Sequence, residues 1–255
     1  MATVHRLADR GYRYIEGVHQ YSGGVAAEPG YQIERVRLAA PVSLAEGFTV
    51  IEATLDALGL PITRLCACEL RSPAPFTEAG FTAFNREYAG RLQAWGLFDG
   101  ERNPIARTNV APLHDPPPVP ALAAFSYTVA SSRERGGFIV AGSGETPEGH
   151  ANYRDHIVRL GDTSPEAMRE KADYVVATME SRLEALGYGW AGAVSTQVYT
   201  VHAVGMQMIG EMADRVGALS GLSWHVSRPP VVDIEFEMDV RGAVVERLAE
   251  DATQM

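Results

Sequence analysis

The chain has 255 residues, of which 46% are hydrophobic and 21% charged, and its formal net charge is −10. This composition is that of an ordinary globular protein, and the length allows one large domain or two of about 125 residues each. The negative charge argues against a nucleic-acid-binding protein, which needs a basic face to offset phosphates.

Cysteine usage and hydropathy indicate the cellular setting. Cys66 and Cys68 are one residue apart, so a mutual disulfide is sterically poor and the pair supplies too few ligands for zinc. We expect two small buried thiols on one face of a core strand, in a reducing, cytoplasmic setting. Residues 1–14 contain no apolar signal segment, and no run approaches the roughly 18 apolar residues of a membrane span.

The first half of the chain predicts alternating strands and helices. The expected elements are an irregular lead-in at 1–20, a loop at 21–30, a strand at 31–38, a helix at 43–59, a strand at 62–70, a helix at 76–95, a strand at 103–110 and a strand at 119–130. Ser43 and Glu46 have the spacing of a capping box, and Gly59 is placed to end the first helix.

The second half repeats this order. The expected elements are a strand at 138–141, a polar loop, a helix at 167–186, a strand at 193–201, a helix at 204–219 and a strand at 231–240. Leu-Asp-Ala-Leu-Gly at 55–59 is matched by Leu-Glu-Ala-Leu-Gly at 183–187, which indicates duplication of one α+β unit. We therefore predict two domains, at 1–130 and 131–255, joined by a polar linker at 131–137. Lys171, the only lysine, is expected on a solvated helical face and is a poor candidate for Schiff-base chemistry.

The stretch 103–110, Asn-Pro-Ile-Ala-Arg-Thr-Asn-Val, places one arginine at the start of a β-branched run. Pro104 fixes its own φ and favours an extended conformation at Asn103. An arginine held in this way can bind a carboxylate with two parallel hydrogen bonds, although a surface arginine on an edge strand is the simpler interpretation.

Acidic residues alternate strictly with apolar ones in the final strand, at 232–239. The pattern places four carboxylates on one face, where a shielded member would have a raised pKa suited to acid–base chemistry. A solvated outer face is the alternative. The first half's last strand has no carboxylate and the second half has Trp224 near the place of Arg107, so one half supplies the arginine and the other the acid.

Other motifs are weak. The sequence contains no phosphate loop, no HExxH motif and no G-x-S-x-G motif, and its seven histidines lack the spacing of a metal pair. Gly142-Ser143-Gly144 is either a plain turn or a small anion-binding nest. We therefore expect neither a metal nor another cofactor.

The element order and three short motifs resemble the RidA (YjgF) family of imine and enamine deaminases. The motifs are Pro-x-Ala-Arg-Thr-x-Val at 104–110, Phe-Asn-x-x-Tyr at 84–88 and Ile-Glu-x-Glu at 234–237. The resemblance implies an α+β fold of two tandem RidA-like (chorismate-mutase-like) units, each a mixed β-sheet with two helices on one face. It also implies assembly into a homo-oligomer, a trimer by the family's habit, with ligand sites in clefts between units.

This resemblance assigns roles to individual residues. Arg107 would bind the carboxylate of a small substrate, Asn85 and Gly142 would help to form the pocket, and Glu235, or Asp233 with a one-step slip, would handle protons. Because the chain is a duplicated form, it is similar to deaminases of 2-aminomuconate-type ring-cleavage products. The expected activity is metal-free hydrolytic deamination of a carboxylated enamine or imine. Hydrolysis of an enol ether such as chorismate, or non-catalytic binding of a small molecule, are the alternatives.

Overall fold

The computed structural model describes residues 2–98, 100–150, 152–216, 221–243 and 245–249. Its helices are α1 (Leu44–Ala57), α2 (Glu78–Ala94), α3 (Pro165–Ala185) and α4 (Gly205–Val216). Its strands are β1 (Val4–Leu7), β2 (Tyr12–Ile15), β3 (Gly24–Ala27), β4 (Tyr31–Ser43), β5 (Leu65–Arg71), β6 (Ala106–Pro112), β7 (Ala121–Ala130), β8 (Phe138–Gly144), β9 (Ser195–Tyr199), β10 (Ser223–His225), β11 (Ser227–Arg228), β12 (Glu237–Arg241) and β13 (Val245–Ala249).

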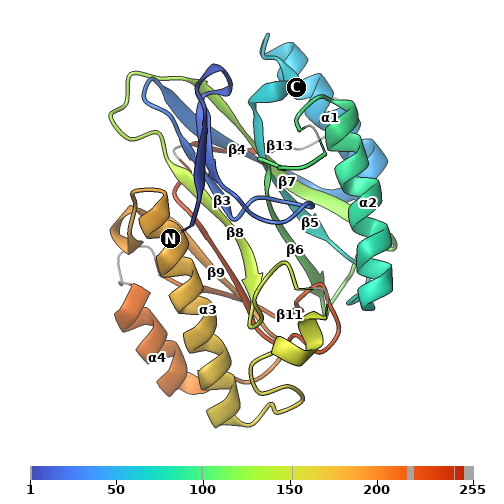
Figure 1. Cartoon of the computed structure of the whole chain (residues 1–255), viewed down its shortest axis with the longest axis vertical. Helices are drawn as coiled ribbons and strands as arrows, with labels where there is room; N and C mark the ends of the chain where they lie inside the picture. The colour runs from blue at the N-terminus through green and yellow to red at the C-terminus, as the bar shows by residue number, and fades with distance from the viewer. Residues whose placement is uncertain (1, 99, 151, 217–220, 244, 250–255) are drawn as a thin grey trace.

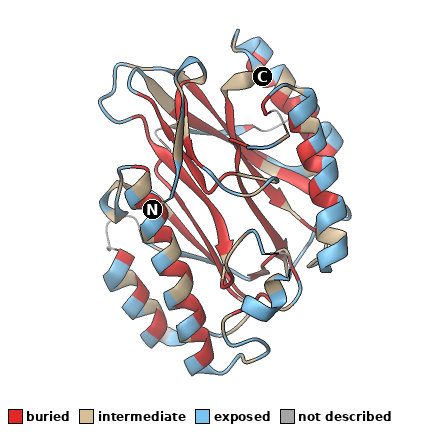
Figure 2. Cartoon of the chain, viewed as in Figure 1, coloured by how far each residue is buried: buried red, intermediate tan, exposed pale blue. Residues whose placement is uncertain are grey.

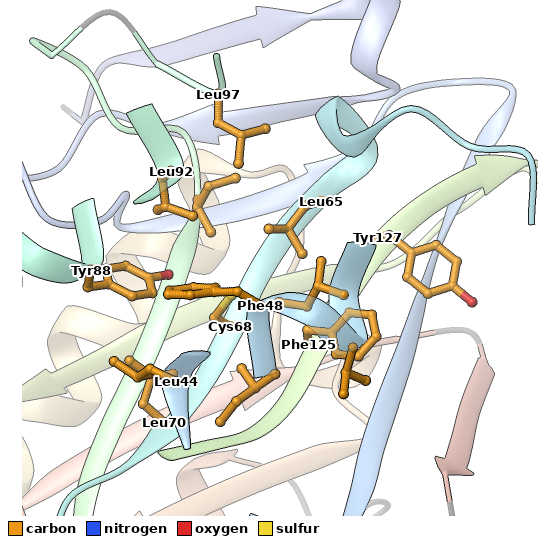
Figure 3. Close-up of a cluster of buried hydrophobic side chains, with 14 of the residues drawn as sticks. Leu44, Phe48, Leu65, Cys68, Leu70, Tyr88, Leu92, Leu97, Phe125 and Tyr127 are labelled. Atoms are coloured by element: carbon orange, nitrogen blue, oxygen red, sulfur yellow. The ribbon is translucent and has the colours of Figure 1, made fainter. Parts of the chain in front are cut away.

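The fold is α+β, with two sheets between two pairs of helices (Figure 1). One cluster of buried side chains lies between α1, α2 and the sheet that contains β4–β7, and Figure 3 shows its centre around Phe48, Tyr88 and Phe125. A second cluster lies between α3, α4 and the sheet that contains β8, β9 and β12. A third, which includes Tyr12, Ile33 and Ile139, joins the two sheets across their inner faces. The inner strands are accordingly buried over most of their length, whereas the edge strands β1, β10 and β13 are mostly half-buried or exposed and the helices bury one face (Figure 2).

Local signals place the helices well. The Ser43 side chain accepts a hydrogen bond from the backbone of Glu46, and the Glu46 carboxylate accepts one from the backbone of Ser43, so the predicted capping box is confirmed. Both glycines of the repeated pentapeptide follow a helix in the left-handed region, with φ +65° at Gly59 and +78° at Gly187. The helix predicted at 204–219 is described over Gly205–Val216, and positions 217–219 lie outside the described residues.

The two sheets share an order of four strands. The first contains β4-β7-β5-β6 and the second β8-β12-β9-β10. In each sheet the first two of the three pairings are antiparallel, and the last two strands are parallel, as β5 is to β6 and β9 to β10.

The ends of the chain extend the opposite sheets. The antiparallel strands β1, β2 and β3 pair in series and join the second sheet at β8, while β13 joins the first sheet beside β4. The irregular lead-in predicted for 1–20 and the loop predicted for 21–30 were therefore wrong. β1 pairs with β2 and β2 with β3, but β3 joins the sheet through β8, more than a hundred residues later, and no local pattern marks that contact.

Two further expectations need correction. Cys66 and Cys68 are buried and free, as predicted, but they face opposite sides of β5. A register shift between Leu65 and Ala67 in the pairing with β7 reverses the alternation there. Lys171 is fully buried rather than solvated, because its ammonium lies 3.0 Å from the Glu145 carboxylate and 2.7 Å from the carbonyl oxygen of Val158.

Buried charges also join the two sheets. The carboxylate of Glu69 on β5 contacts Arg241 of β12 and Arg35 of β4, each at 2.6 Å. Arg241 and Arg35 together hold the pKa of Glu69 well below its ordinary value, in spite of its burial.

No helix of the described ranges is long and apolar enough to cross a membrane.

Candidate active site

A cavity of about 560 Å³ opens where the two sheets meet. Its walls come from the segment 17–21, the start of α2, β6, the end of β8 with the loop that follows it, and residues 230–237. Both sheets therefore contribute side chains to one cavity.

Arg107 forms part of the cavity wall and is only 3% exposed. Its guanidinium is surrounded by aromatic rings, with centroids at 4.7 Å for Tyr21, 5.1 Å for Tyr88, 5.5 Å for Phe81 and 5.7 Å for Phe84. Burial lowers the pKa of Arg107, and its Nη1 has no hydrogen-bond partner in the protein. A buried, planar and under-bonded guanidinium is suited to binding a carboxylate.

Residues around Arg107 fix its place. The Asn103 side chain donates hydrogen bonds to the backbone oxygens of His19 (3.3 Å) and Gln20 (3.0 Å) and accepts one from the backbone of Ile105 (3.0 Å). The start of β6 is thereby tied to the segment that carries Tyr21 over the guanidinium.

Glu237, the first residue of β12, lines the same cavity, as Glu78 and Glu148 do, and it is 4% exposed. Burial raises its pKa well above the ordinary value, and Asp239, Glu148 and Glu145 raise it further, while Arg107 opposes them. The raised pKa favours a protonated carboxyl group, which can donate a proton. Gly142 leaves room for this group, because a Cβ there would lie 2.2 Å from Glu237 Oε1.

Asn85 of α2 also lines the cavity and is 2% exposed. Neither its Nδ2 nor its Oδ1 has a hydrogen-bond partner in the protein. Unsatisfied buried amides are rare, and they are found where a ligand or water completes them. The position of Asn85 thus agrees with the pocket role expected for it.

Glu235 and Asp233 are not among the residues that line the cavity. The Glu235 carboxylate contacts His202 at 2.6 Å and Arg228 at 3.2 Å. Asp233 contacts Arg154 at 2.7 Å and has a left-handed backbone, with φ +74°. The structure brings Arg107, Asn85 and Gly142 together with Glu237 instead.

The local backbone explains this difference. The strand predicted at 231–240 was wrong in its first half, since β12 begins only at Glu237. The Glu145 carboxylate accepts hydrogen bonds from the backbone N–H groups of Glu235 (2.7 Å) and Phe236 (2.9 Å), so these N–H groups cannot pair with a neighbouring strand.

Glu148, another acid that lines the cavity, and its partners Tyr21 and Arg182 were missed in the sequence. Glu148 accepts a hydrogen bond from the Tyr21 hydroxyl at 3.4 Å and contacts Arg182 at 2.8 Å. Burial and the neighbouring Glu148 raise the pKa of Tyr21 well above its ordinary value. Tyr21 and Glu148 stand in glycine-rich segments with no periodic pattern, so only their residue types could have marked them. Within the described ranges, no three His, Cys, Asp or Glu side chains are grouped as a metal site would require.

An α+β protein whose two sheets bring a buried arginine and a buried carboxyl group of raised pKa to one cavity fits the class of small-molecule enzymes that use acid–base chemistry. The model of one family, described as 2-aminomuconate deaminase CnbZ, matches residues 4–247, and the chain belongs to that family. A relative in Comamonas testosteroni, named 2-amino-5-chloromuconate deaminase, is 53% identical over 238 residues, which cover 92% of this chain and 95% of the relative.

Two solved structures show a more distant likeness. A chorismatase is 14% identical, with a TM-score of 0.49, over 86% of this chain and 77% of its own. A Thermotoga maritima protein described as an endoribonuclease is 19% identical, with a TM-score of 0.32, over 42% of this chain and 78% of its own. These scores are too low to support an argument about function.

Proposed function

We propose that this protein is a metal-free hydrolytic deaminase of 2-aminomuconate or a substituted 2-aminomuconate, a dicarboxylic acid with an amino group on a carbon–carbon double bond. One observation carries the proposal: Arg107 and Glu237, from different sheets, line the same cavity. Membership of the 2-aminomuconate deaminase family and the named activity of the Comamonas relative support the choice of substrate.

The two residues divide the chemistry. Arg107 binds the carboxylate next to the amino-bearing carbon and so holds that carbon in place. The protonated Glu237 donates its proton to the neighbouring carbon of the double bond, which converts the enamine into an iminium ion. Glu237, now a carboxylate, accepts a proton from water as the water oxygen bonds to the iminium carbon, which gives a neutral carbinolamine. Proton transfer to nitrogen and cleavage of the carbon–nitrogen bond release ammonia and leave a ketone, so the balance is one water consumed for one ammonia formed.

This proposal assigns the role of the acid to Glu237 and not to Glu235. Both belong to the same alternating run, but the Glu235 carboxylate is held by His202 and Arg228, whereas Glu237 lines the cavity and has the raised pKa. Asn85 is a substrate-binding residue, and Gly142 provides the space that the Glu237 carboxyl group occupies.

We infer that the chain is a tandem of two RidA-like units, at 1–130 and 131–255, that exchange strands at their ends. The common order of four strands supports this inference. The residues that pair across corresponding strands support it too. Cys68 pairs with Arg107 and Phe125 in the first sheet, and Val198 pairs with Trp224 and Met238 in the second.

This register assigns a single site to each chain. In the second sheet, Trp224 takes the position that Arg107 has in the first. In the first sheet, Ala124 takes the position that Glu237 has in the second, because Ala124 pairs with Glu69 as Glu237 pairs with Tyr199. A second cleft built on Trp224 and Ala124 would have neither the carboxylate-binding cation nor the acid.

Ammonia release tests the function directly. Purified protein is incubated with 2-aminomuconate, with chorismate and with buffer, and ammonia and pyruvate are measured. We expect ammonia from 2-aminomuconate and no pyruvate from chorismate, which would exclude the enol-ether alternative. Prior treatment with EDTA should leave the rate unchanged, and a loss that Zn²⁺ or Mn²⁺ restores would refute the metal-free mechanism.

We also propose that the chain forms a homo-oligomer, with a trimer as the expected state, because exposed sheet edges favour pairing with other chains. Light scattering at micromolar concentration measures the mass directly. A value near the 27.6 kDa of one chain would contradict this assembly.

A further inference from the structure

The wall around Arg107 contains more unsatisfied donors than the proposed mechanism uses. Among the residues that line the cavity, Arg107 Nη1, Asn85 Nδ2 and Asn109 Nδ2 are buried polar atoms without a hydrogen-bond partner in the protein. A buried N–H without a partner costs about 1–3 kcal/mol, so several of them at one cavity indicate a ligand that accepts hydrogen bonds. Asn109 has no role in the mechanism so far.

Asn109 is held in a defined orientation. It is 3% exposed, and its Oδ1 accepts a hydrogen bond from the hydroxyl of Ser72 at 3.0 Å. Ser72, which follows β5, is fully buried, so its hydroxyl has no competing water. With Oδ1 occupied, the remaining function of the amide is that of Nδ2, an N–H donor at the cavity wall.

Asn109 and Arg107 act from the same strand. They are two residues apart on β6, so their side chains leave the same face with their Cα atoms roughly 7 Å apart. A carboxylate has two oxygens and about four acceptor positions, so a guanidinium and an amide can bind it together.

The fold does not require either residue. In the second sheet the position that corresponds to Arg107 is Trp224, and the position two residues later is Val226. Both polar side chains of the first sheet are thus replaced by apolar ones where no cavity of this kind is proposed.

We propose that Asn109 is a substrate-binding residue whose Nδ2 donates a hydrogen bond to the carboxylate that Arg107 holds, and that Ser72 is a positioning residue that fixes the direction of this donor. The inference rests on the proposed function for the identity of the substrate, a dicarboxylate with one carboxylate beside the amino-bearing carbon. It makes Asn109 a determinant of the preference for carboxylate over amide or ester at that carbon.

Binding of cis,cis-muconate tests this without turnover, because that dicarboxylate lacks the amino group and cannot be deaminated. Calorimetry would compare the wild type with Asn109→Ala and Asn109→Asp. Loss of one hydrogen bond to a charged group should raise Kd about tenfold to hundredfold in Asn109→Ala. Asn109→Asp should bind more weakly still, because it places a carboxylate against the ligand's own.

Ser72→Ala is a second variant, which tests the inference if the Asn109 variants fail to fold. It frees the Asn109 amide to rotate, so KM for 2-aminomuconate should rise about threefold to tenfold while kcat stays within about twofold. A purely structural role would change both or neither. The matched control is Thr54→Val, which removes a buried hydroxyl that bonds the backbone of its own helix at 2.7 Å, away from the cavity.

The outcomes separate this inference from the proposed function. A wild type that binds muconate but releases no ammonia from 2-aminomuconate would refute the deaminase and leave the carboxylate site in place. Conversely, a folded Asn109→Ala variant with wild-type affinity for muconate would overturn the inference while the deaminase stands. Failure of the wild type to bind muconate at millimolar concentration would also overturn it.

Discussion

Lys171 and Glu145 form an ion pair in the interior of the second half, with 3.0 Å between Nζ and Oε1 and no solvent exposure of either side chain. The Glu145 carboxylate also holds the backbone that leads into β12, where Glu237 begins the strand. This pair thus connects helix α3 to the position of the proposed acid.

Replacing Lys171 by Met should lower the free energy of unfolding by about 3 kcal/mol, because it leaves a buried carboxylate without its cation. Burial already raises the pKa of Glu145, and loss of Lys171 should raise it further. The deficit should therefore be smaller at pH 5 than at pH 8, since protonation removes the unpaired charge. Urea denaturation measures the difference.

Arg169→Met is the control for this prediction. Arg169 lies on the same helix and contacts Glu211 at 3.0 Å, but both side chains are more than 40% exposed. An exposed pair contributes at most about 1 kcal/mol, so equal losses in the two variants would contradict the importance of burial.

The two glutamates of the alternating run should differ in their effect on turnover. Glu237→Gln keeps the shape and removes the proton, so kcat for ammonia release should fall by roughly 10²–10⁴. Glu235→Gln should change kcat by less than about threefold, since Glu235 contacts His202 and Arg228 and does not line the cavity. The reverse pattern would restore Glu235 as the acid.

The sequence predicted features that depend on neighbouring residues. The capping box of Ser43 and Glu46 and the glycines that follow α1 and α3 result from interactions within a few residues, and a β-branched run marked the strand that carries Arg107. The separation of arginine and acid between the two halves was also visible, because it required only the residue types of corresponding strands.

Other features depend on contacts between distant segments, which no local pattern records. β3 pairs with β8, more than a hundred residues later, and β2 and β1 then extend that sheet in series. Lys171 is buried because Glu145, 26 residues earlier, faces it, and the choice between Glu235 and Glu237 depends on the hydrogen bonds that Glu145 takes from the backbone. Residue types alone could not distinguish two glutamates on the same face of one predicted strand.

Arg107→Lys should mainly weaken substrate binding. A lysine keeps the charge but loses the planar group that lies among Tyr21, Phe81, Phe84 and Tyr88 and that can form two parallel hydrogen bonds. We expect KM to rise about tenfold to hundredfold, with a smaller change in kcat. Arg135→Lys, at an exposed arginine 5.1 Å from the ring of Tyr188, is the control and should leave both constants unchanged.

The raised pKa of Glu237 gives a pH dependence with a defined sign. The proposed mechanism begins with the protonated carboxyl group, so kcat/KM should be constant at low pH and fall as the pH rises through this pKa, which lies well above 4.5. Burial lowers the pKa of Arg107, so any loss of its charge would weaken binding in the same direction at high pH. A rate that rises with pH over this range would show that Glu237 acts first as a base.

The free energy of unfolding should also depend on the protonation of Glu237. Between the ordinary pKa of a glutamate and the raised value in the folded protein, the folded state binds one more proton than the unfolded state, so Glu237 makes the wild type less stable as the pH rises. The free energy of unfolding falls by at most about 1.4 kcal/mol per pH unit for one proton.

Glu237→Gln removes this penalty, so the stability of the variant relative to the wild type should be greater at pH 8 than at pH 5, even though its activity is lost. Urea denaturation of both proteins at the two pH values measures the difference. An equal difference at both values would mean that Glu237 is ionised in the folded protein, and the proton that the mechanism requires would have to come from another residue.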